Sequence, residues 1–513
     1  MASEVQTLNK YPYSATTLVI TTYADGYRAV GTAALVGSND LLTATHVVYA
    51  PDHGGWATQL EVYAAVDYNS ATGRFESQPL VQMGRFQWDA YGYPDQVFSV
   101  GSNLTVTYGE SQYDMAIIGL SKAIGARLGW FGIDAGHDTP QWAYQLGYPE
   151  GSTGMIEGRA YVTKENGYEV YSANSASGSD ILGPGSSGGP LFVYDANGKA
   201  QIIGVKSSGS TTESHWADIG WQSPMLERLI ASNGNLLGSS MVSLTGTAGN
   251  DSWKTGRVDE RFDGGAGHDE VTFLGARADY HIQHESGTQF AVGALKDGMD
   301  GNNLLQDVEL LRFSDYTVDL TVQDIAARHT TAQVNNVIEL YHGFFNRIPD
   351  ASGLAYWLGQ QDTGMSLRQM GDAFFNAALV YADYTGYARD MSPDAFIRTV
   401  YKNVLERDSV DAGGMAYWQN KLATGEETRA SFIQNVTQAA HVYKGDATWG
   451  WVADAADNKL AVSRAFSLDM ALGWNTAAES ITKGKAIAEA VTPTSTLEAL
   501  KLIGIDPAIH DIV

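Results

Sequence analysis

The sequence contains no cysteine among its 513 residues. This absence excludes disulfide bonds, a thiolate nucleophile, and zinc or iron–sulfur centres that need cysteine ligands. The folded chain must therefore be stabilised by packing or by hard metal ions that bind oxygen. Glycine, in contrast, is abundant, with 56 residues. We therefore expect frequent tight turns.

Positive charge is also scarce, because 32 Lys and Arg stand against 58 Asp and Glu, a net charge of −26. Such a charge opposes phosphate binding over most of the surface, so we expect no nucleic-acid partner. No apolar run approaches the roughly 18 residues that cross a bilayer, and we expect no membrane span. Residues 1–17 lack the basic and apolar stretches of a secretory signal. The chain is therefore expected to be cytoplasmic or exported through a C-terminal signal.

The length, together with 44% hydrophobic and only 18% charged residues, predicts a folded, multidomain chain. Residues 1–240 contain short β-rich runs separated by Gly, Asn and Asp, which predict an all-β sandwich or barrel. Residues 241–325 are rich in Gly and Asp, with 15 acidic against 6 basic residues. Residues 326–450 and 451–513 show helical spacing and predict an all-α region. We therefore place domain boundaries near 240, 325 and 450.

Three short segments carry side chains suited to nucleophilic catalysis. Residues 185–190 read Gly-Ser-Ser-Gly-Gly-Pro, and these glycines let the backbone bend sharply around Ser187. His46 ends one apolar run, and Asp114 precedes another. A serine hydroxyl is a poor nucleophile until a nearby base takes its proton, so the set predicts acyl transfer. Taken singly, each residue also fits an ordinary loop serine, strand histidine or turn cap.

In the order His, Asp, Ser, these segments resemble the marks T-A-x-H, D-(I/M)-A and G-x-S-G-G-P of the chymotrypsin-like serine endopeptidases. The resemblance covers roughly residues 1–240 and implies a double β-barrel with the site between the barrels. It implies that Ser187 is the nucleophile, that His46 is the general base and then acid, and that Asp114 orients the imidazole and stabilises its cation. The amides of Gly185 and Ser187 would form the oxyanion hole.

The resemblance extends to the strand that follows the nucleophile. It implies that Ser207, Ser208 and Gly209 pair with the substrate backbone as an added antiparallel strand. Ser207 also matches a serine that often contacts the triad carboxylate. Lys206 matches a position that lines the specificity pocket, where it would hold an acidic side chain on the acyl side of the cut. The alternative is that Lys206 simply faces water.

One position departs from the trypsin-like animal enzymes, which place an aspartate before the nucleophile to receive a newly freed N-terminus. This chain has Ser186 there, so that mode of activation is not expected. Bacterial relatives of the glutamyl-endopeptidase type are the closer comparison.

Residues 246–272 divide into three blocks of nine, GTAGNDSWK, TGRVDERFD and GGAGHDEVT. The first and third blocks resemble the G-(G/T)-x-G-x-D-x-U-x repeat of RTX-type secreted proteins, in which two nonamers make one coil of a parallel β-roll. Stacking of these blocks would let Asp251 and Asp269 share one structural Ca²⁺ with carbonyls of the turns. Residues 304–315 resemble the strands that cap such rolls. Ordinary Gly/Asp loops would give the same pattern.

The pattern D-x-x-G-x-x-Y-W occurs twice, once beginning at Asp350 and again at Asp411. It resembles an uncharacterised tandem helical domain that accompanies RTX segments in secreted bacterial proteins. The simplest interpretation is structural, with Asp as a helix cap and Tyr-Trp in a core. The alternative is a Trp/Tyr surface that binds a glycan or another cell-surface partner.

Residues 503–513 place an acid before terminal apolar residues, which resembles the uncleaved signal of type I secretion substrates. We therefore predict a secreted serine endopeptidase that acts on proteins or peptides, joined to a calcium roll and a helical accessory region. Two other classes stay open. One is a non-catalytic, calcium-dependent adhesin on the same scaffold, and the other is a protease that cuts only itself.

Overall fold

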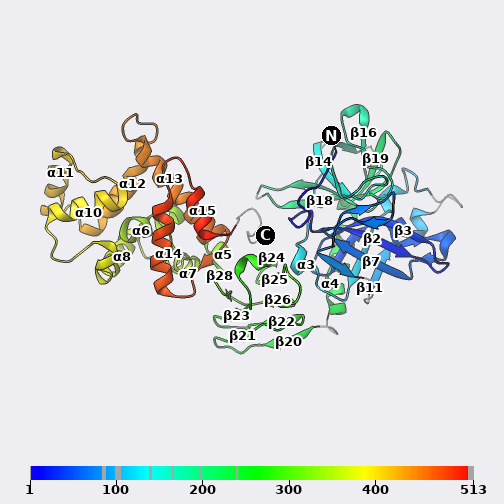
Figure 1. The fold of residues 1–513 in the computed structure, drawn as a ribbon, viewed down its shortest axis with the longest axis horizontal. Coiled ribbons are helices and arrows are strands. Elements are labelled where there is room, and N and C mark those ends of the chain that lie inside the picture. The colour runs from blue at the N-terminus through cyan, green and yellow to red at the C-terminus, as the bar shows by residue number, and fades with distance from the viewer. Residues whose placement is uncertain are drawn as a thin grey trace.

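A computed structural model describes residues 2–83, 88–98, 105–137, 141–164, 167–196, 198–237 and 241–505. Figure 1 shows three parts that follow one another in chain order: a double β-barrel, a parallel β-roll and a helical region. This architecture confirms the predicted fold class. Within the described ranges, no helix is both long enough and apolar enough to cross a membrane.

The first sheet is antiparallel and has seven strands. In spatial order they are β10 (Val81–Met83), β7 (Gln59–Ala64), β2 (Thr16–Thr22), β3 (Arg28–Leu35), β4 (Asp40–Thr43), β12 (Ala116–Leu120) and β11 (Trp88–Gly92). The inner strand β2 is buried along almost its whole length, which fits its sequence of β-branched residues and one leucine.

The second sheet closes into a barrel, because β16 pairs with both β19 and β15. Its strands are, in spatial order, β1 (Ser3–Glu4), β15 (Ile156–Lys164), β14 (Gln141–Gly147), β17 (Pro190–Tyr194), β18 (Ala200–Gly209), β19 (Glu213–Asp218) and β16 (Val170–Asn174), with β13 (Gly132–Ile133) beside β18. In β15, Ala160 and Val162 are buried while Arg159 and Tyr161 are exposed. This alternation places one face of the strand in the barrel interior.

Short elements connect the strands of the two sheets. They are α1 (Thr45–Val48), α2 (Pro94–Val97), α3 (Gly125–Leu128), the hairpins β5 (Tyr49–Ala50) with β6 (Gly55–Trp56) and β8 (Tyr68–Asn69) with β9 (Arg74–Phe75), and the longer helix α4 (Ser223–Leu237), which ends this part.

The first coil of the β-roll is built from parallel strands whose partners lie 18 residues apart, as in the pairs Val242↔Glu260 and Ser252↔Glu270. The first and third nonamers therefore stack, as the repeat predicts. From residue 280 onward, the strands that extend its two sheets include antiparallel pairs. One sheet of the roll contains β20 (Val242–Thr245), β22 (Glu260–Asp263), β26 (Asn302–Gln306), β25 (Gln289–Ala294) and β24 (Tyr280–Ser286). The other contains β21 (Ser252–Lys254), β23 (Glu270–Thr272), β27 (Leu310–Arg312), β28 (Thr317–Asp319) and β29 (Leu472–Gly473).

The helical region contains two copies of a three-helix unit. The copies are α6 (Thr331–Phe345), α7 (Ala351–Asp362) and α8 (Leu367–Val380), then α10 (Pro393–Leu405), α11 (Ala412–Ala423) and α12 (Arg429–Ala440). The other helices are α5 (Val322–Ala327), α9 (Ala382–Thr385), α13 (Gly450–Arg464), α14 (Ala477–Ala490) and α15 (Leu497–Ile503). Helix α6 begins at a capping box in which Thr330 and Gln333 exchange hydrogen bonds, and Ser366 does the same for α8.

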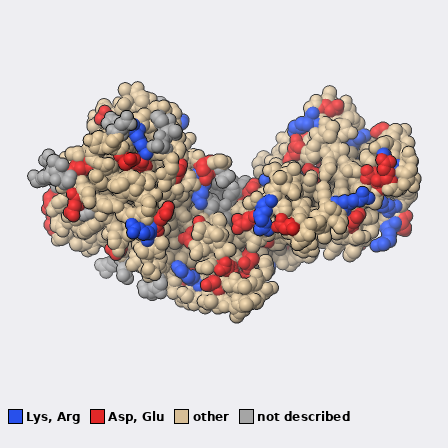
Figure 2. Space-filling model, turned by 180° about the vertical axis from the view of Figure 1, so that it is seen from behind, with Lys and Arg blue, Asp and Glu red and all other residues tan. Residues whose placement is uncertain are grey.

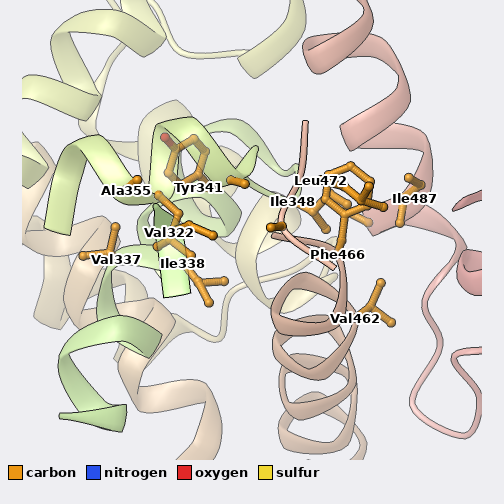
Figure 3. Close-up of a cluster of buried hydrophobic side chains, with 14 of the residues drawn as sticks. Val322, Val337, Ile338, Tyr341, Ile348, Ala355, Val462, Phe466, Leu472 and Ile487 are labelled. Carbon is orange, nitrogen blue, oxygen red and sulfur yellow. The ribbon is translucent and has the colours of Figure 1, made fainter. Parts of the chain in front are cut away.

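A single apolar core joins the roll to the helices, because one cluster of buried side chains extends from Phe262 to Ile505. Figure 3 shows Phe466, Leu472 and Ile487 gathered beside Ile348. Strand β29 brings this C-terminal segment back to the roll, where it pairs with β28. The boundaries near 240, 325 and 450 stay predictions.

Charged side chains are dispersed over the surface. Figure 2 shows acidic and basic residues scattered in small groups over one face, and no broad basic area is visible there.

Candidate active site

His46 and Asp114 meet because they follow and precede two paired strands. Strand β4 ends just before α1, which holds His46, and β12 begins just after Asp114, with Thr43 opposite Ala116 in the antiparallel register. The ring Nδ1–H of His46 donates to Asp114 Oδ2 at 2.6 Å, and its backbone N–H donates to Oδ1 at 3.0 Å. The Asp114 side chain is fully buried, whereas the His46 side chain is 22% exposed.

Ser187 lies in a turn that packs against the same α1 segment. Its carbonyl accepts a hydrogen bond from Thr32 N–H at 2.8 Å. Gly31 lies between the serine turn and α1. A Cβ atom at Gly31 would be 2.6 Å from Val47 Cγ1 and 3.4 Å from Ser187 O. The structure thus brings the serine turn beside the residue that follows His46.

The turn depends on glycine at Gly188. Its φ is +82°, and a Cβ would come within 2.1 Å of Thr43 Oγ1 and 2.2 Å of Thr32 O. No side chain fits there, so the backbone after the serine can lie directly on β3 and β4. This contact holds the serine turn against the barrel that supplies His46.

The amides on either side of Ser186 are available to a substrate. Ser186 N–H donates to Gly183 O at 3.2 Å, but within the described ranges neither Gly185 N–H nor Ser187 N–H donates to a protein acceptor. Gly185 has a φ of +87°, and Thr32 Oγ1 donates to its carbonyl at 2.9 Å. Two donors left open two residues apart form the arrangement that can stabilise an oxyanion.

The residues after Lys206 lie on a strand edge. Gly188 N–H donates to Lys206 O at 2.7 Å, which is the last contact of β18 with the serine turn. The pairing of β17 with β18 ends at Val205, so Ser207 and Ser208 have no register partner on β17, and the pairing with β19 is irregular between Lys206 and Gly209. Ser207 instead donates to Asp114 Oδ2 at 2.5 Å. The backbone here can accept an added strand.

Lys206 does not face water, because only 6% of the residue is exposed. Its Nζ donates to Ser208 O at 3.0 Å and lies 4.8 Å from the centre of the Trp216 ring. Within the described residues, no carboxylate is paired with this amine, and burial alone accounts for its lowered pKa. The buried cation therefore has donors to spare.

Two further buried groups beside Lys206 were not singled out by the sequence analysis. Ser214 Oγ and Trp216 Nε1 are buried and have no hydrogen-bond partner within the described chain. Trp216 lies opposite Lys206 in the register of β18 and β19, and Ser214 lies opposite Gly209. Because side chains alternate between the two faces of a strand, Ser214 and Trp216 lie on the same face of β19. This alternation identifies them as neighbours of Lys206 only when the pairing of β18 with β19 is known.

A second contact that the sequence did not reveal joins the two barrels. Ser111 Oγ lies 2.7 Å from Ser208 Oγ, so a residue just before Asp114 contacts the candidate substrate strand. No sequence pattern marks Ser111 for this role.

The electrostatics of the site depend on two titratable groups. Burial favours the neutral imidazole of His46, but the adjacent Asp114 carboxylate outweighs burial and raises the pKa of His46 above its usual value. Burial lowers the pKa of Lys206 to about 7. Lys206 also opposes protonation of His46. The arrangement supplies a base held by a carboxylate, next to a cation of reduced basicity.

The roll contains a carboxylate whose environment fits a cation. Asp269 is fully buried; its Oδ1 accepts from Asp251 N–H at 2.7 Å, whereas its Oδ2 has no partner within the described residues. Glycine turns surround it, since a Cβ on Gly264 would lie 1.9 Å from Asp307 O and 2.5 Å from Asp269 Oδ2. Carboxylate and carbonyl oxygens are the ligands that Ca²⁺ prefers. The described chain holds no cluster of three or more His, Asp or Glu suited to a metal, so any ion would depend on backbone carbonyls.

The predicted secretion signal lies largely outside the described residues, which end at 505.

The repeated aromatic pairs divide between core and surface. The ring centres of Trp357 and Phe374 lie 4.8 Å apart, and Trp418 Nε1–H donates to Tyr401 Oη at 3.0 Å. The preceding residues, Tyr356 and Tyr417, are more than half exposed.

Comparison with known proteins finds likeness in two places. Residues 383–443 match the family described as "Domain of unknown function (DUF4214)". No curated protein matches the chain.

Among solved structures, the chain is similar to a Glu endopeptidase in complex with MPD, at 21% identity over 45% of this chain and 96% of that chain, with a TM-score of 0.33. It is also similar to the protease Anisep from Arthrobacter nicotinovorans, at 15% identity over 45% and 100% of the two chains, with a TM-score of 0.34. A thermostable serine protease, AL20, from an extremophilic microorganism matches at 18% identity over 43% and 97%, with a TM-score of 0.33.

Proposed function

We propose that this chain is a serine endopeptidase in which Ser187 is the nucleophile, His46 the general base and acid, and Asp114 the group that orients His46. The observation that carries the proposal is the buried Asp114 carboxylate, which binds both the ring and the backbone of His46 beside the glycine-bounded turn of Ser187. A carboxylate in this position fixes the imidazole tautomer and stabilises the imidazolium that forms during the reaction.

The reaction proceeds in two halves. Ser187 Oγ attacks the peptide carbonyl carbon while its proton passes to His46 Nε2, and the amides of Gly185 and Ser187 stabilise the oxyanion. The C–N bond then breaks, and the leaving amine takes the proton from His46. Water next attacks the acyl-enzyme, gives a proton to His46, and releases the new carboxyl end as that proton returns to Ser187.

We further propose that the enzyme favours an acidic residue on the acyl side of the cut. Lys206 is a buried ammonium group without a carboxylate partner, and Ser214 beside it is a buried hydroxyl without a partner in the described chain. A substrate carboxylate that reached Lys206 Nζ would accept a charge-assisted hydrogen bond, which is roughly twice as strong as a neutral one.

One Ca²⁺ would complete the roll. The open Oδ2 of Asp269 and the nearby Asp251 are the side chains that would hold it, together with carbonyls of the glycine turns. The ion would supply a positive charge that satisfies a buried carboxylate, and would take no part in peptide hydrolysis. We propose an extracellular location, with export by type I secretion, because calcium is plentiful there and the terminal residues resemble such a signal.

A fluorophosphonate probe tests the catalytic proposal directly. Wild type should be labelled at Ser187 and should hydrolyse casein, whereas Ser187→Ala should lose the label and about 10⁶ in turnover, as should His46→Ala in turnover. Ser186→Ala is the matched control and should keep the label. Absence of label on folded wild type would contradict the proposal and favour a binding protein. A single cut seen by intact mass, without activity on added casein, would favour self-processing.

A further inference from the structure

A cavity of about 320 Å³ opens in the helical region, far from the serine turn in the chain. It lies where the N-terminal ends of α7 and α14 meet the segment after α8 and the short strand β29. Its volume is at the lower end of the range of small-molecule sites. Residues separated by more than 160 positions line it, from Thr317 to Lys485.

Two tyrosines line one side of this cavity and keep much of their surface in water. Tyr381 is 43% exposed and Tyr384 is 50% exposed, and Phe345 lines the cavity with them. Aromatic rings bury large areas when a ligand covers them, and their negative faces attract the weakly positive C–H groups of a flat apolar surface. The cavity therefore offers stacking surfaces that no described residue covers fully.

The polar groups of the cavity differ from those of the second helical copy. In the second copy, Asp411 caps α11 and accepts from Gly414 N–H at 2.8 Å. In the first copy, the equivalent Asp350 makes no cap hydrogen bond to α7. Its carboxylate instead accepts from Ser480 Oγ at 2.7 Å and from Arg347 at 3.3 Å. The carboxylate therefore faces the cavity residues rather than its own helix.

Trp474 also lines the cavity, but its Nε1–H is closed to solvent and has no partner within the described chain, so it is not offered to a ligand. Two residues with hydroxyl groups, Thr317 and Thr476, line the cavity as well. Donors and acceptors are thus mixed around one small space.

Each charged group of the cavity already has a partner in the chain. Arg347 pairs with Asp350, and Lys485 donates to Tyr384 O at 3.2 Å and lies 3.8 Å from Glu489, which is outside the cavity. An anionic ligand would have to compete with these partners, so the cavity suits a neutral ligand that carries several hydroxyl groups. A sugar ring has this chemistry, because it presents C–H groups on its faces and hydroxyl groups around its edge.

We propose that this cavity binds a neutral saccharide unit, with Tyr381 and Tyr384 stacking on the ring and with Asp350 accepting hydrogen bonds from its hydroxyl groups. The site gives the first helical copy a function that the second copy lacks, since the second copy uses its aspartate as a helix cap. It would hold the chain on a glycan surface independently of peptide hydrolysis.

The test uses the full chain with Ser187→Ala, so that binding is measured without hydrolysis. The chain is applied to an array of neutral and acidic oligosaccharides, and the best soluble neutral oligosaccharide is then titrated by calorimetry. Tyr384→Ala should weaken binding about tenfold through lost stacking. Asp350→Asn should keep the packing and weaken binding roughly three- to tenfold through the lost charged acceptor.

Tyr417→Ala is the matched control, because Tyr417 is 53% exposed and lies in the second copy, outside the cavity. It should bind as the parent does, and all variants should unfold at the parent's temperature. The proposal fails if no neutral saccharide binds at millimolar concentration, or if Tyr384→Ala and Asp350→Asn bind unchanged. Binding only to acidic sugars, or to peptides instead of sugars, would equally overturn it.

Discussion

The barrel and the roll each contain a completely buried aspartate, Asp114 and Asp269, and the two carboxylates differ in their hydrogen bonds. Asp114 Oδ1 accepts from His46 N–H, and its Oδ2 accepts from the His46 ring and from Ser207. Asp269 Oδ1 accepts from Asp251 N–H, but its Oδ2 has no partner in the described chain. A buried carboxylate is costly unless it is paired and hydrogen-bonded. The barrel therefore provides every partner itself, whereas the described part of the roll provides none for Asp269 Oδ2.

The difference also separates two kinds of function. Asp114 is fixed by hydrogen bonds from the chain itself. On the proposed calcium site, Asp269 would be fixed fully only with a cation bound, and the stability of the roll would then depend on calcium. If both interpretations hold, changes at one aspartate should alter turnover and changes at the other should alter calcium-dependent stability.

The largest expected effect is on catalysis. Asp114→Asn should keep the fold but favour the wrong imidazole tautomer, and should lower kcat by about 10⁴. Hydrolysis of a peptide substrate by purified protein at matched active-site concentration measures this loss. Asp269→Asn in saturating calcium is the control and should keep turnover within about twofold. An equal loss in both variants would remove the distinction between the two sites.

Stability should respond to calcium through Asp269. At a calcium concentration about 100-fold above Kd, the free energy of unfolding of the roll should rise by about 2.7 kcal/mol relative to chelator. Asp269→Asn should abolish most of this difference in denaturant titrations. Asp297→Asn is the matched control, because the Asp297 side chain belongs to the same part of the chain but is 90% exposed. Identical curves with calcium and chelator for wild type would rule out the ion.

Lys206 is buried like the two aspartates but carries an amine instead of a carboxylate. Lys206→Gln should lower the preference for acidic over neutral peptides roughly 10- to 100-fold, because hydrogen bonds to a charged group are lost. Burial lowers the pKa of Lys206 to about 7, so the preference of wild type should fall as pH rises through that value. His46 has a raised pKa and must be neutral to act, so overall turnover should instead rise with pH above 6.5. Profiling a peptide library at several pH values would show an unchanged preference if Lys206 plays no part.

The smallest expected effect comes from a partly exposed ion-pair network. The hydrogen bond of His441 to Glu339 raises the pKa of His441 against the opposing effect of burial, and Asp457 raises it further. A raised histidine pKa adds stability that is complete below pH 6.5 and is lost as pH rises through the folded value. Since His441 is 29% exposed, the contribution should be under about 1 kcal/mol. Unfolding curves of wild type and His441→Gln between pH 5 and 8 should converge at the alkaline end, and parallel curves would contradict this sign.

The sequence predicted best what is encoded locally. Strand alternation and the 18-residue coil are properties of neighbouring residues, and the structure confirms both the barrel and the stacked nonamers. His46, Asp114 and Ser187 could be singled out because their segments, in this order, resemble the motifs of one protease family. Their roles in catalysis stay predictions.

What the sequence could not reveal depends on contacts between distant segments. The contact of Ser111 with Ser208 spans 97 residues, and the neighbours of Lys206 depend on a shifted strand register. The cavity of the helical region combines Asp350 with Ser480, which lie 130 residues apart. Nothing in the repeat pattern distinguishes Asp350 from Asp411. Asp350 accepts a hydrogen bond from Ser480 of the distant helix α14, whereas Asp411 caps its own helix.

Strand β29 has a consequence for synthesis of the chain. Because Leu472 and Gly473 cover the edge of β28, the ribosome must translate more than 150 further residues after β28 before that edge is paired. An unpaired edge invites association with other chains, so the nascent roll should need protection during this interval. The N-terminal barrels contain their own strand partners and can fold during the same interval.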